Sequence, residues 1–264
     1  MLRFGKGEYS GDVLNAFSDG GVTACLTTYQ QSDFNQTPHY HENTHISFVL
    51  HGGCLEKKKD RYERLPGKLT CYNAGEPHQV INVADHSRHI NIEIEPCFFR
   101  DHQIAESNVF AGLSTNPDVK FLILNIYREI IAADEFSNLS IHLLLLNLIH
   151  NAGKYKTIRY LPSWVNIVKD QLHENWNRSI SLQTLADEAN IHPVTISKYF
   201  PKYFSCTLGQ YMRKLKIERS LALVKSPDAT LAGVAYECGF ADQSHFIRTF
   251  KQLTGFLPGY YQKL

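Results

Sequence analysis

The chain has few of the features that mark secreted or membrane proteins. Its six cysteines are scattered and form no CxxC pair, so we expect reduced thiols and no disulfide framework. The N-terminal residues lack the apolar run of a signal peptide. The most apolar stretch, residues 141–149, is interrupted by His142 and Asn147 and is too short to span a bilayer. We therefore expect a cytoplasmic protein with no membrane partner.

An overall excess of charge is also missing, because 27 Lys and Arg oppose 26 Asp and Glu. The two halves of the chain nevertheless differ. Residues 1–159 contain 15 basic and 18 acidic side chains, whereas residues 160–264 contain 12 and 8. A mildly acidic first part joined to a basic second part is expected when only the second part meets a polyanion.

The first hundred residues predict an all-β domain. Residues 89–95 alternate strictly between polar and apolar, as a half-buried strand does. Turn-forming residues separate further short β-branched and aromatic runs, and this spacing predicts a sandwich or barrel. We assign residues 1–105 to this domain, with strands expected at residues 44–50, 69–72, 79–83 and 90–94.

Two amphipathic helices are expected after the β region. Apolar residues recur at three- and four-residue steps between Val119 and Ile131, and again between Ile141 and Ile149. The second helix is apolar around most of its circumference, so we expect it to be buried on more than one side. It should end in a linker at residues 151–156. We assign residues 106–158 as a helical linker, which either forms a dimer interface or merely caps the β domain.

The last hundred residues contain one pattern twice. Residues 181–200 and residues 230–250 each predict a helix, a tight turn and a second helix. The apolar positions of the first helix recur 49 residues later, and those of the second helix recur 50 residues later. This is the helix-turn-helix layout. We assign residues 159–264 to an all-α domain in which a helix over residues 207–225 connects the two units.

The second helix of each unit is the candidate DNA-reading element. We expect apolar positions to face inward, namely Ile196, Tyr199 and Phe200 in the first unit and Phe246, Phe250 and Leu253 in the second. The other positions should face the major groove or the phosphates, where Arg suits guanine, Gln suits adenine and Lys suits phosphate. These candidates are Val194, Thr195, Ser197, Lys198 and Lys202, then Gln243, Ser244, His245, Ile247, Arg248 and Lys251.

The local signals at the helix starts agree with this assignment. Pro193 suits the first turn of a helix, and Asp242 suits an N-cap. With two rigidly joined units, we expect α-helices to enter adjacent major grooves about 34 Å apart on one face of the duplex.

Residues from about Val165 to Leu264 resemble the DNA-binding domain of the AraC/XylS transcriptional regulators, most specifically at residues 239–251 and 254–261. The resemblance implies a seven-helix domain in which Val194, Ser197, Lys198, Gln243, Ser244, His245 and Arg248 face the groove. It also implies a regulator, more often an activator than a repressor, with double-stranded DNA, RNA polymerase and a small effector as partners. One departure is Asn190, where the family often has Gly, but Asn tolerates a left-handed backbone.

Histidines gather in the first part of the chain, which holds ten of the thirteen. His39, His41 and His45, followed by His78 in the segment 75–82, resemble the two cupin motifs, with His45 where the motif has Glu. An HxH pair on a strand places both rings on one face. Three or four converging imidazoles suit Zn, Fe, Cu or Ni.

Two other interpretations of these histidines stay open. They can be hydrogen-bonded interior residues without an ion, or they can line an effector pocket in a cupin-like barrel together with Tyr40, Tyr72 and Asn82. The motif carboxylate is missing, which counts against catalysis. We therefore expect a regulator that is not an enzyme and has no cofactor beyond a metal at this cluster. A metal-dependent cupin enzyme fused to a DNA-binding domain is the alternative.

Overall fold

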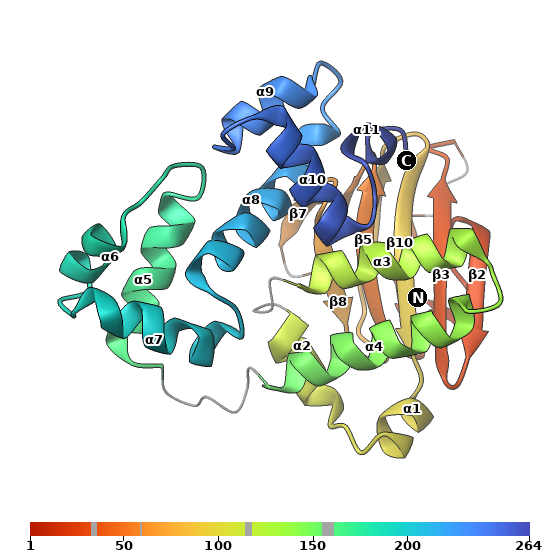
Figure 1. The fold of residues 1–264 in the computed structure, drawn as a ribbon. Helices are drawn as coiled ribbons and strands as arrows, with labels where there is room; N and C mark the ends of the chain where they lie inside the picture. The colour runs from red at the N-terminus through yellow and green to blue at the C-terminus, as the bar shows by residue number, and fades with distance from the viewer. Residues whose placement is uncertain (33–35, 59, 114–117, 155–160) are drawn as a thin grey trace. The chain divides into compact units, whose positions relative to one another are not determined.

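The computed structural model describes residues 1–32, 36–58, 60–113, 118–154 and 161–264. The chain forms two compact units, an N-terminal one that extends to Gly153 and a C-terminal one from Lys154 to Lys263 (Figure 1). The helices of segment 106–158 pack into the N-terminal unit. The expected domain boundary between residues 158 and 159 lies outside the described residues. Among those described, no helix is long and apolar enough to cross a membrane.

The N-terminal unit begins with strands only, which confirms the predicted all-β class. The described strands pair in a five-stranded sheet (β2-β3-β10-β5-β8), a three-stranded sheet (β7-β6-β9) and a parallel pair (β1-β4). No pairing within the described residues closes them into one hydrogen-bonded barrel. The strands are Leu2–Phe4 (β1), Asp12–Asp19 (β2), Val22–Tyr29 (β3), His39–His41 (β4), Thr44–His51 (β5), Cys54–Lys57 (β6), Arg61–Arg64 (β7), Leu69–Tyr72 (β8), Gln79–Val83 (β9) and Ser87–Ile94 (β10).

Strand β10 is buried on both faces, so the prediction of a half-buried strand is wrong. Its apolar face presents Ile90 and Ile92, which are fully buried, but Asn91 and Glu93 on the polar face are each only 1 % exposed. Helix α3, Val119–Ala132, crosses one face of the five-stranded sheet (Figure 1). The polar side chains of β10 face an enclosed interior instead of solvent. The predicted alternation is present, and two residues of its polar half, His89 and Asn91, line an enclosed cavity.

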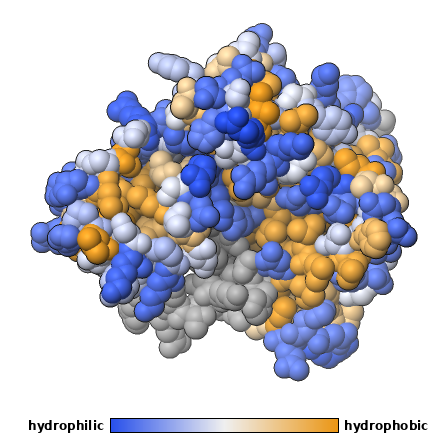
Figure 2. All heavy atoms as spheres, in the orientation of Figure 1, coloured by the Kyte–Doolittle hydropathy of each residue, from blue (hydrophilic) through white to orange (hydrophobic). Residues whose placement is uncertain are grey.

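Helix α4, Ser137–Lys154, differs from expectation in two ways. It continues through residues 151–154, which were predicted as linker, while Tyr155 and Lys156 lie outside the described residues. Ile141, Leu145 and Leu148 are buried, but Leu139 and Leu143 are 63 % and 59 % exposed. The helix is therefore covered on one side only, and Figure 2 shows hydrophobic side chains gathered over it. Two short helices, Pro96–Asp101 (α1) and Glu106–Leu113 (α2), precede α3.

Within its described residues, the C-terminal unit has the seven helices that the family resemblance implies. Helices α9 and α10 lie 49 and 50 residues after α6 and α7, at both ends of each helix. The connecting helix, α8, buries one apolar stripe, in which Tyr211, Leu215 and Leu221 are at most 5 % exposed. The helices are Ser163–Glu174 (α5), Leu182–Glu188 (α6), Pro193–Phe204 (α7), Leu208–Val224 (α8), Leu231–Glu237 (α9), Gln243–Thr254 (α10) and Pro258–Tyr261 (α11).

Candidate nucleic-acid interface and histidine cluster

The two helix-turn-helix units make their turns with the same backbone geometry. The residue that leaves the first helix is left-handed in both, with φ of 51° at Asn190 and 67° at Gly239. Asn190 thus takes the position that glycine fills in the second unit, as predicted. Gly239 has a further constraint, because a Cβ there would lie 1.9 Å from the carbonyl oxygen of Asn177.

Side-chain caps fix where each helix begins. The hydroxyl of Ser181 accepts a hydrogen bond from the N–H of Thr184, and Thr230 caps α9 in the same way. Asp242 Oδ1 accepts from the N–H of His245 at 2.7 Å, which confirms the predicted N-cap. Pro193 occupies the first turn of α7, also as predicted. The first helix of each unit therefore begins with an equivalent cap, whereas the reading helices are capped differently, by the His192 ring in α7 and by the Asp242 carboxylate in α10.

The inward face of α7 was predicted correctly at two positions of three. Ile196 and Phe200 are fully buried, and the Phe200 ring stacks on Phe204 at 4.2 Å between centroids. Tyr199 is 40 % exposed, so its predicted inward position is wrong. The buried row follows four-residue steps from Ile196 to Phe204, which turns Tyr199 to the outer side, where the amine of Lys198 lies 5.4 Å from its ring centroid.

The candidate groove-facing side chains of both helices are largely accessible. On α10, Phe246 and Phe250 are fully buried and Leu253 is half-buried beside them. The exposed candidates are Val194, Ser197, Lys198, Lys202, Gln243, Ser244, Arg248 and Lys251, and the half-buried ones are Thr195, His245 and Ile247. Their contact with bases or phosphates stays a prediction.

Lys216, on α8, lies half-buried against the turn of the second unit. Its Nζ donates to the carbonyl oxygen of Gly239 at 2.5 Å and lies 5.6 Å from the ring centroid of Phe240. Burial lowers the pKa of the Lys216 amine. The connecting helix therefore holds the turn of the second unit through one long side chain. Helical periodicity could not have located this contact, because it depends on how far the side chain reaches between elements.

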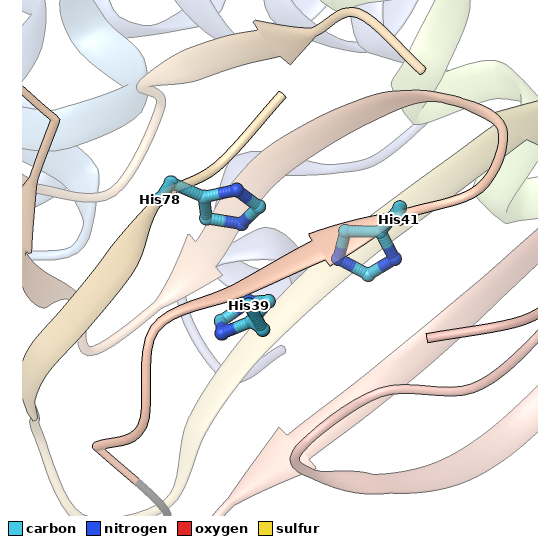
Figure 3. Close-up of side chains that lie close together, drawn as sticks. All are labelled: His39, His41 and His78. Atoms are coloured by element: carbon cyan, nitrogen blue, oxygen red, sulfur yellow. The ribbon is translucent and has the colours of Figure 1, made fainter. Parts of the chain in front are cut away.

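Four histidines of the N-terminal unit come together as predicted. His39 and His41 belong to β4, His45 to β5, and the backbone of His78 bonds that of His39 in both directions at 2.9 Å. All four are at most 5 % exposed. One ring nitrogen from each of His39, His41 and His78 lies within 4.8 Å of the other two (Figure 3). The His45 ring lies 4.0 Å from that of His41, between centroids, but falls outside this set of three.

The protonation state of two of these rings follows from their partners. His39 Nδ1 lies 3.2 Å from the carbonyl oxygen of Thr37, and His78 Nδ1 lies 3.2 Å from that of Glu76. A carbonyl only accepts, so Nδ1 must be the donor and Nε2 carries the lone pair. Burial lowers the pKa of His39, and burial together with the neighbouring His39 lowers the pKa of His78 to about 2. Both rings are therefore neutral at neutral pH.

A carboxylate that sequence reasoning missed lies beside this cluster. Glu93 Oε1 is 3.7 Å from His41 Nδ1, and its Oε2 accepts from the Asn43 amide and the Gly7 N–H, both at 3.3 Å. Burial raises the pKa of Glu93, but the neighbouring side chains of His41, Tyr9 and Asn43 outweigh burial and hold that pKa below its usual range. The cupin motif places its acid near His45, whereas this one comes from β10. Its position in phase with Asn91 on an alternating strand was the available signal.

The space enclosed by these side chains is small. The cavity has a volume of about 30 Å³. Of the three neighbours predicted for an effector pocket, Tyr72 lines it, whereas Tyr40 and Asn82 do not. The cluster histidines share the lining with Tyr9, Ser10, Tyr29, Ser47, Arg64, Val80, Val83, His89 and Asn91.

Comparison with known proteins supports the C-terminal assignment. Residues 185–264 match the family model described as a helix-turn-helix domain. The HTH-type transcriptional activator RhaS of Escherichia coli is 19 % identical over 254 residues, which covers 86 % of this chain and 87 % of RhaS.

Solved structures also resemble parts of the chain. A DNA-binding transcriptional dual regulator from Escherichia coli K-12 is 23 % identical, with a TM-score of 0.36, and the match covers 39 % of this chain and 98 % of that one. An apo form of a ToxT variant from Vibrio cholerae is 10 % identical, with a TM-score of 0.39, and the match covers 93 % and 98 %. These structural likenesses are weak. The assignment of the C-terminal domain therefore depends on the sequence matches, on the repeated helix-turn-helix unit and on the segments 239–251 and 254–261. Residues 185–264 therefore form an AraC-type helix-turn-helix domain, and the chain is similar along most of its length to a DNA-binding transcriptional regulator.

Proposed function

We propose that this regulator binds double-stranded DNA by placing α7 and α10 in adjacent major grooves, and that a ligand held in the N-terminal unit alters this binding. The observation that carries the proposal is the equivalence of the two units. Both reading helices begin after a capped first helix and a left-handed turn residue, and both leave basic side chains exposed. Two rigid readers in one small domain match two half-elements on one face of a duplex.

The exposed side chains divide into those that suit base recognition and those that suit phosphate contact. Arg248 and Gln243 carry the groups that match the major-groove edges of guanine and adenine, whereas Lys202 and Lys251 near the helix ends suit phosphates. Arg248 should therefore determine which sequence is bound, and the lysines should contribute to the binding of every sequence.

We infer an activator that contacts RNA polymerase, because RhaS, to which the chain is similar along most of its length, is described as an activator. We also infer that residues 1–105 form the sensing domain, that residues 106–158 form the helical linker and that residues 159–264 form the DNA-binding domain. The similarity to RhaS along most of the chain favours this interpretation over a fused metal-dependent enzyme.

We further propose that a second copy of the chain covers the outer face of α4. Leu139 and Leu143 lie four residues apart on that face and are each more than half exposed. Apolar side chains aligned in this way are typical of helix pairs that meet at an interface. Leu143→Glu should shift the chain from dimer to monomer in sedimentation velocity without unfolding it. An unchanged sedimentation coefficient would assign the face another role.

The DNA-binding proposal is tested by selecting binding sites from random duplexes and measuring affinities by fluorescence anisotropy. Arg248→Ala should weaken a selected site by about 1–3 kcal/mol and relax one base position. Lys251→Ala should weaken selected and random DNA alike and reduce the salt dependence by about one released counterion. Lys263→Ala, which removes an exposed charge at the chain end, is the matched control and should change neither.

Two results would contradict the proposal. Equal losses for Arg248→Ala on selected and random DNA would remove the assigned role in base recognition. Failure of the unmodified chain to enrich any sequence would contradict specific DNA binding altogether.

A further inference from the structure

We propose that His39, His41 and His78 bind one divalent transition-metal ion, and that this ion is the ligand sensed by the N-terminal unit. The second half of the proposal rests on the proposed regulatory function, whereas the first does not. The two halves are therefore tested by separate measurements.

The three rings are already gathered around one point. One nitrogen of each lies within 4.8 Å of the others, and the rings come from β4 and from the residue that precedes β9 (Figure 3). Nitrogens bonded to one tetrahedral ion at ~2.0–2.1 Å lie about 3.3 Å apart, so these nitrogens must approach one another by up to about 1.5 Å. Side-chain rotation within the cluster can supply a movement of this size.

The outer nitrogen of each ring faces an acceptor, as in histidines that bind metals. Nδ1 of His39 and of His78 donates to a backbone carbonyl, and Nδ1 of His41 lies 3.7 Å from the Glu93 carboxylate. Metal-binding histidines usually donate their second N–H to a carbonyl or carboxylate, which orients the ring and directs the other nitrogen to the metal. Nε2 is the ligand atom that this arrangement offers from each ring.

The contact between His41 and Glu93 leaves buried polar atoms without hydrogen-bond partners. Within the described residues, His41 Nδ1, Glu93 Oε1 and His45 Nδ1 are buried without a hydrogen-bond partner. A buried polar atom left without a partner costs about 1–3 kcal/mol. A bound ion would draw His41 into place, shorten its contact with Glu93 and so offset part of this cost.

The size of the cavity decides between an ion and an organic effector. Its volume of about 30 Å³ exceeds the ~10–15 Å³ that a cavity needs to hold one water molecule. Pockets for organic ligands are usually about 300–1,000 Å³. The cavity therefore has room for an ion and a water molecule but not for a sugar or an aromatic acid. Neutral imidazoles select Zn²⁺, Ni²⁺, Cu²⁺ or Fe²⁺ over Mg²⁺ and Ca²⁺.

The first experiment measures binding without DNA. Full-length protein is stripped with a chelator and titrated with ZnCl₂ by calorimetry and with CoCl₂ by visible absorption. We expect one ion per chain, and Co²⁺ absorption bands typical of a low-coordinate nitrogen site. His78→Asn retains a donor for the Glu76 carbonyl but lacks Nε2, so it should lose both signals while melting normally when metal-free.

Two further variants sharpen this test. Glu93→Gln should retain the site but weaken it by about 10–100-fold, as changes to groups that orient metal ligands do. His86→Asn is the matched control, because His86 lies outside the cluster at a left-handed position that Asn tolerates, and it should bind like the unmodified chain. Absence of stoichiometric Zn²⁺ and Co²⁺ binding, or full binding by a folded His78→Asn, would overturn the metal site.

The second experiment tests sensing. The affinity of the unmodified chain for a selected DNA site is measured with chelator and with saturating Zn²⁺, and His78→Asn is measured alongside. We expect the metal to change the affinity of the unmodified chain several-fold and to leave His78→Asn unaffected. Stoichiometric metal binding with no change in DNA affinity would overturn sensing alone, whereas no DNA binding under either condition would overturn the proposed function.

Discussion

The interiors of the two units differ in chemistry. The C-terminal unit is filled with apolar side chains such as Phe200 and Phe246, both fully buried. The N-terminal unit encloses Glu56, Arg64 and the four clustered histidines, all at most 5 % exposed. Burying a large apolar side chain stabilises a fold by about 1.5–3 kcal/mol, whereas a buried ion pair roughly breaks even. The C-terminal unit thus gains stability from its apolar interior, whereas the polar groups enclosed in the N-terminal unit add little to its stability.

The largest expected effect comes from breaking the buried polar network of the N-terminal unit. Arg64 lies 3.2 Å from the Glu56 carboxylate, which also accepts hydrogen bonds from the hydroxyls of Tyr62 and Tyr72 at 2.6 Å. Arg64→Met should lower the free energy of unfolding by about 3–5 kcal/mol, because it leaves the Glu56 charge buried and unpaired. Urea unfolding followed by circular dichroism measures this loss.

The double variant Arg64→Met with Glu56→Gln is the control for that prediction. The Gln carbonyl still accepts from both tyrosine hydroxyls but carries no charge, so most of the lost stability should return. If the double variant were as unstable as the single one, lost packing and not the unpaired charge would be the cause.

An intermediate effect separates the two turns of the C-terminal unit. Gly239→Ala places a methyl group against the Asn177 carbonyl at a left-handed position, and it should cost at least about 1–3 kcal/mol. Asn190→Gly meets neither constraint and should change stability by less than about 1 kcal/mol. Thermal melts of the two variants side by side test this. Equal losses would mean that the turns are not constrained differently.

The smallest effect is a pH dependence that originates at His89. This ring is buried, its Nε2 lies 3.1 Å from the Ser87 hydroxyl, and Tyr29 and Arg64 face it. Burial, followed by the Arg64 charge, lowers the pKa of His89 well below its usual value. Below about pH 6.5, His89 therefore binds a proton in the unfolded chain but stays neutral in the folded chain. The free energy of unfolding consequently falls by ~1.4 kcal/mol per pH unit as pH drops below this value.

His89→Gln removes this titration. Between about pH 7.5 and about pH 5.5, the metal-free variant should lose ~1.4 kcal/mol less stability than the unmodified protein. Urea titrations at the two pH values provide the comparison. Parallel losses in both proteins would show that His89 does not contribute to the acid sensitivity.

Local sequence signals were sufficient for most of the fold. Strands β8 and β9 and the spacing of the repeated helices were predicted to the residue, because period, caps and turn residues are encoded within a few positions. Asn190 was correctly expected to adopt a left-handed backbone for the same reason. These features depend on neighbours along the chain and not on the tertiary fold.

The errors occur where contacts between distant segments decide the outcome. Tyr199 was misplaced because which of two adjacent positions faces inward depends on the packing partner. Glu93 was missed because its importance comes from proximity to His41, 52 positions earlier in the chain. Helix α4 was expected to be covered on more than one side because periodicity reports that a face is apolar but not whether another element of the same chain covers it.

The contact between Lys216 and the Gly239 carbonyl lowers the number of basic side chains in the DNA-binding domain that are free to contact DNA. Counterion release depends on cations that reach the duplex and not on formal charge. The ammonium group of Lys216 is committed within the protein, over the ring of Phe240. The slope of log affinity against log salt should therefore be shallower than a simple tally of the basic residues in this domain suggests.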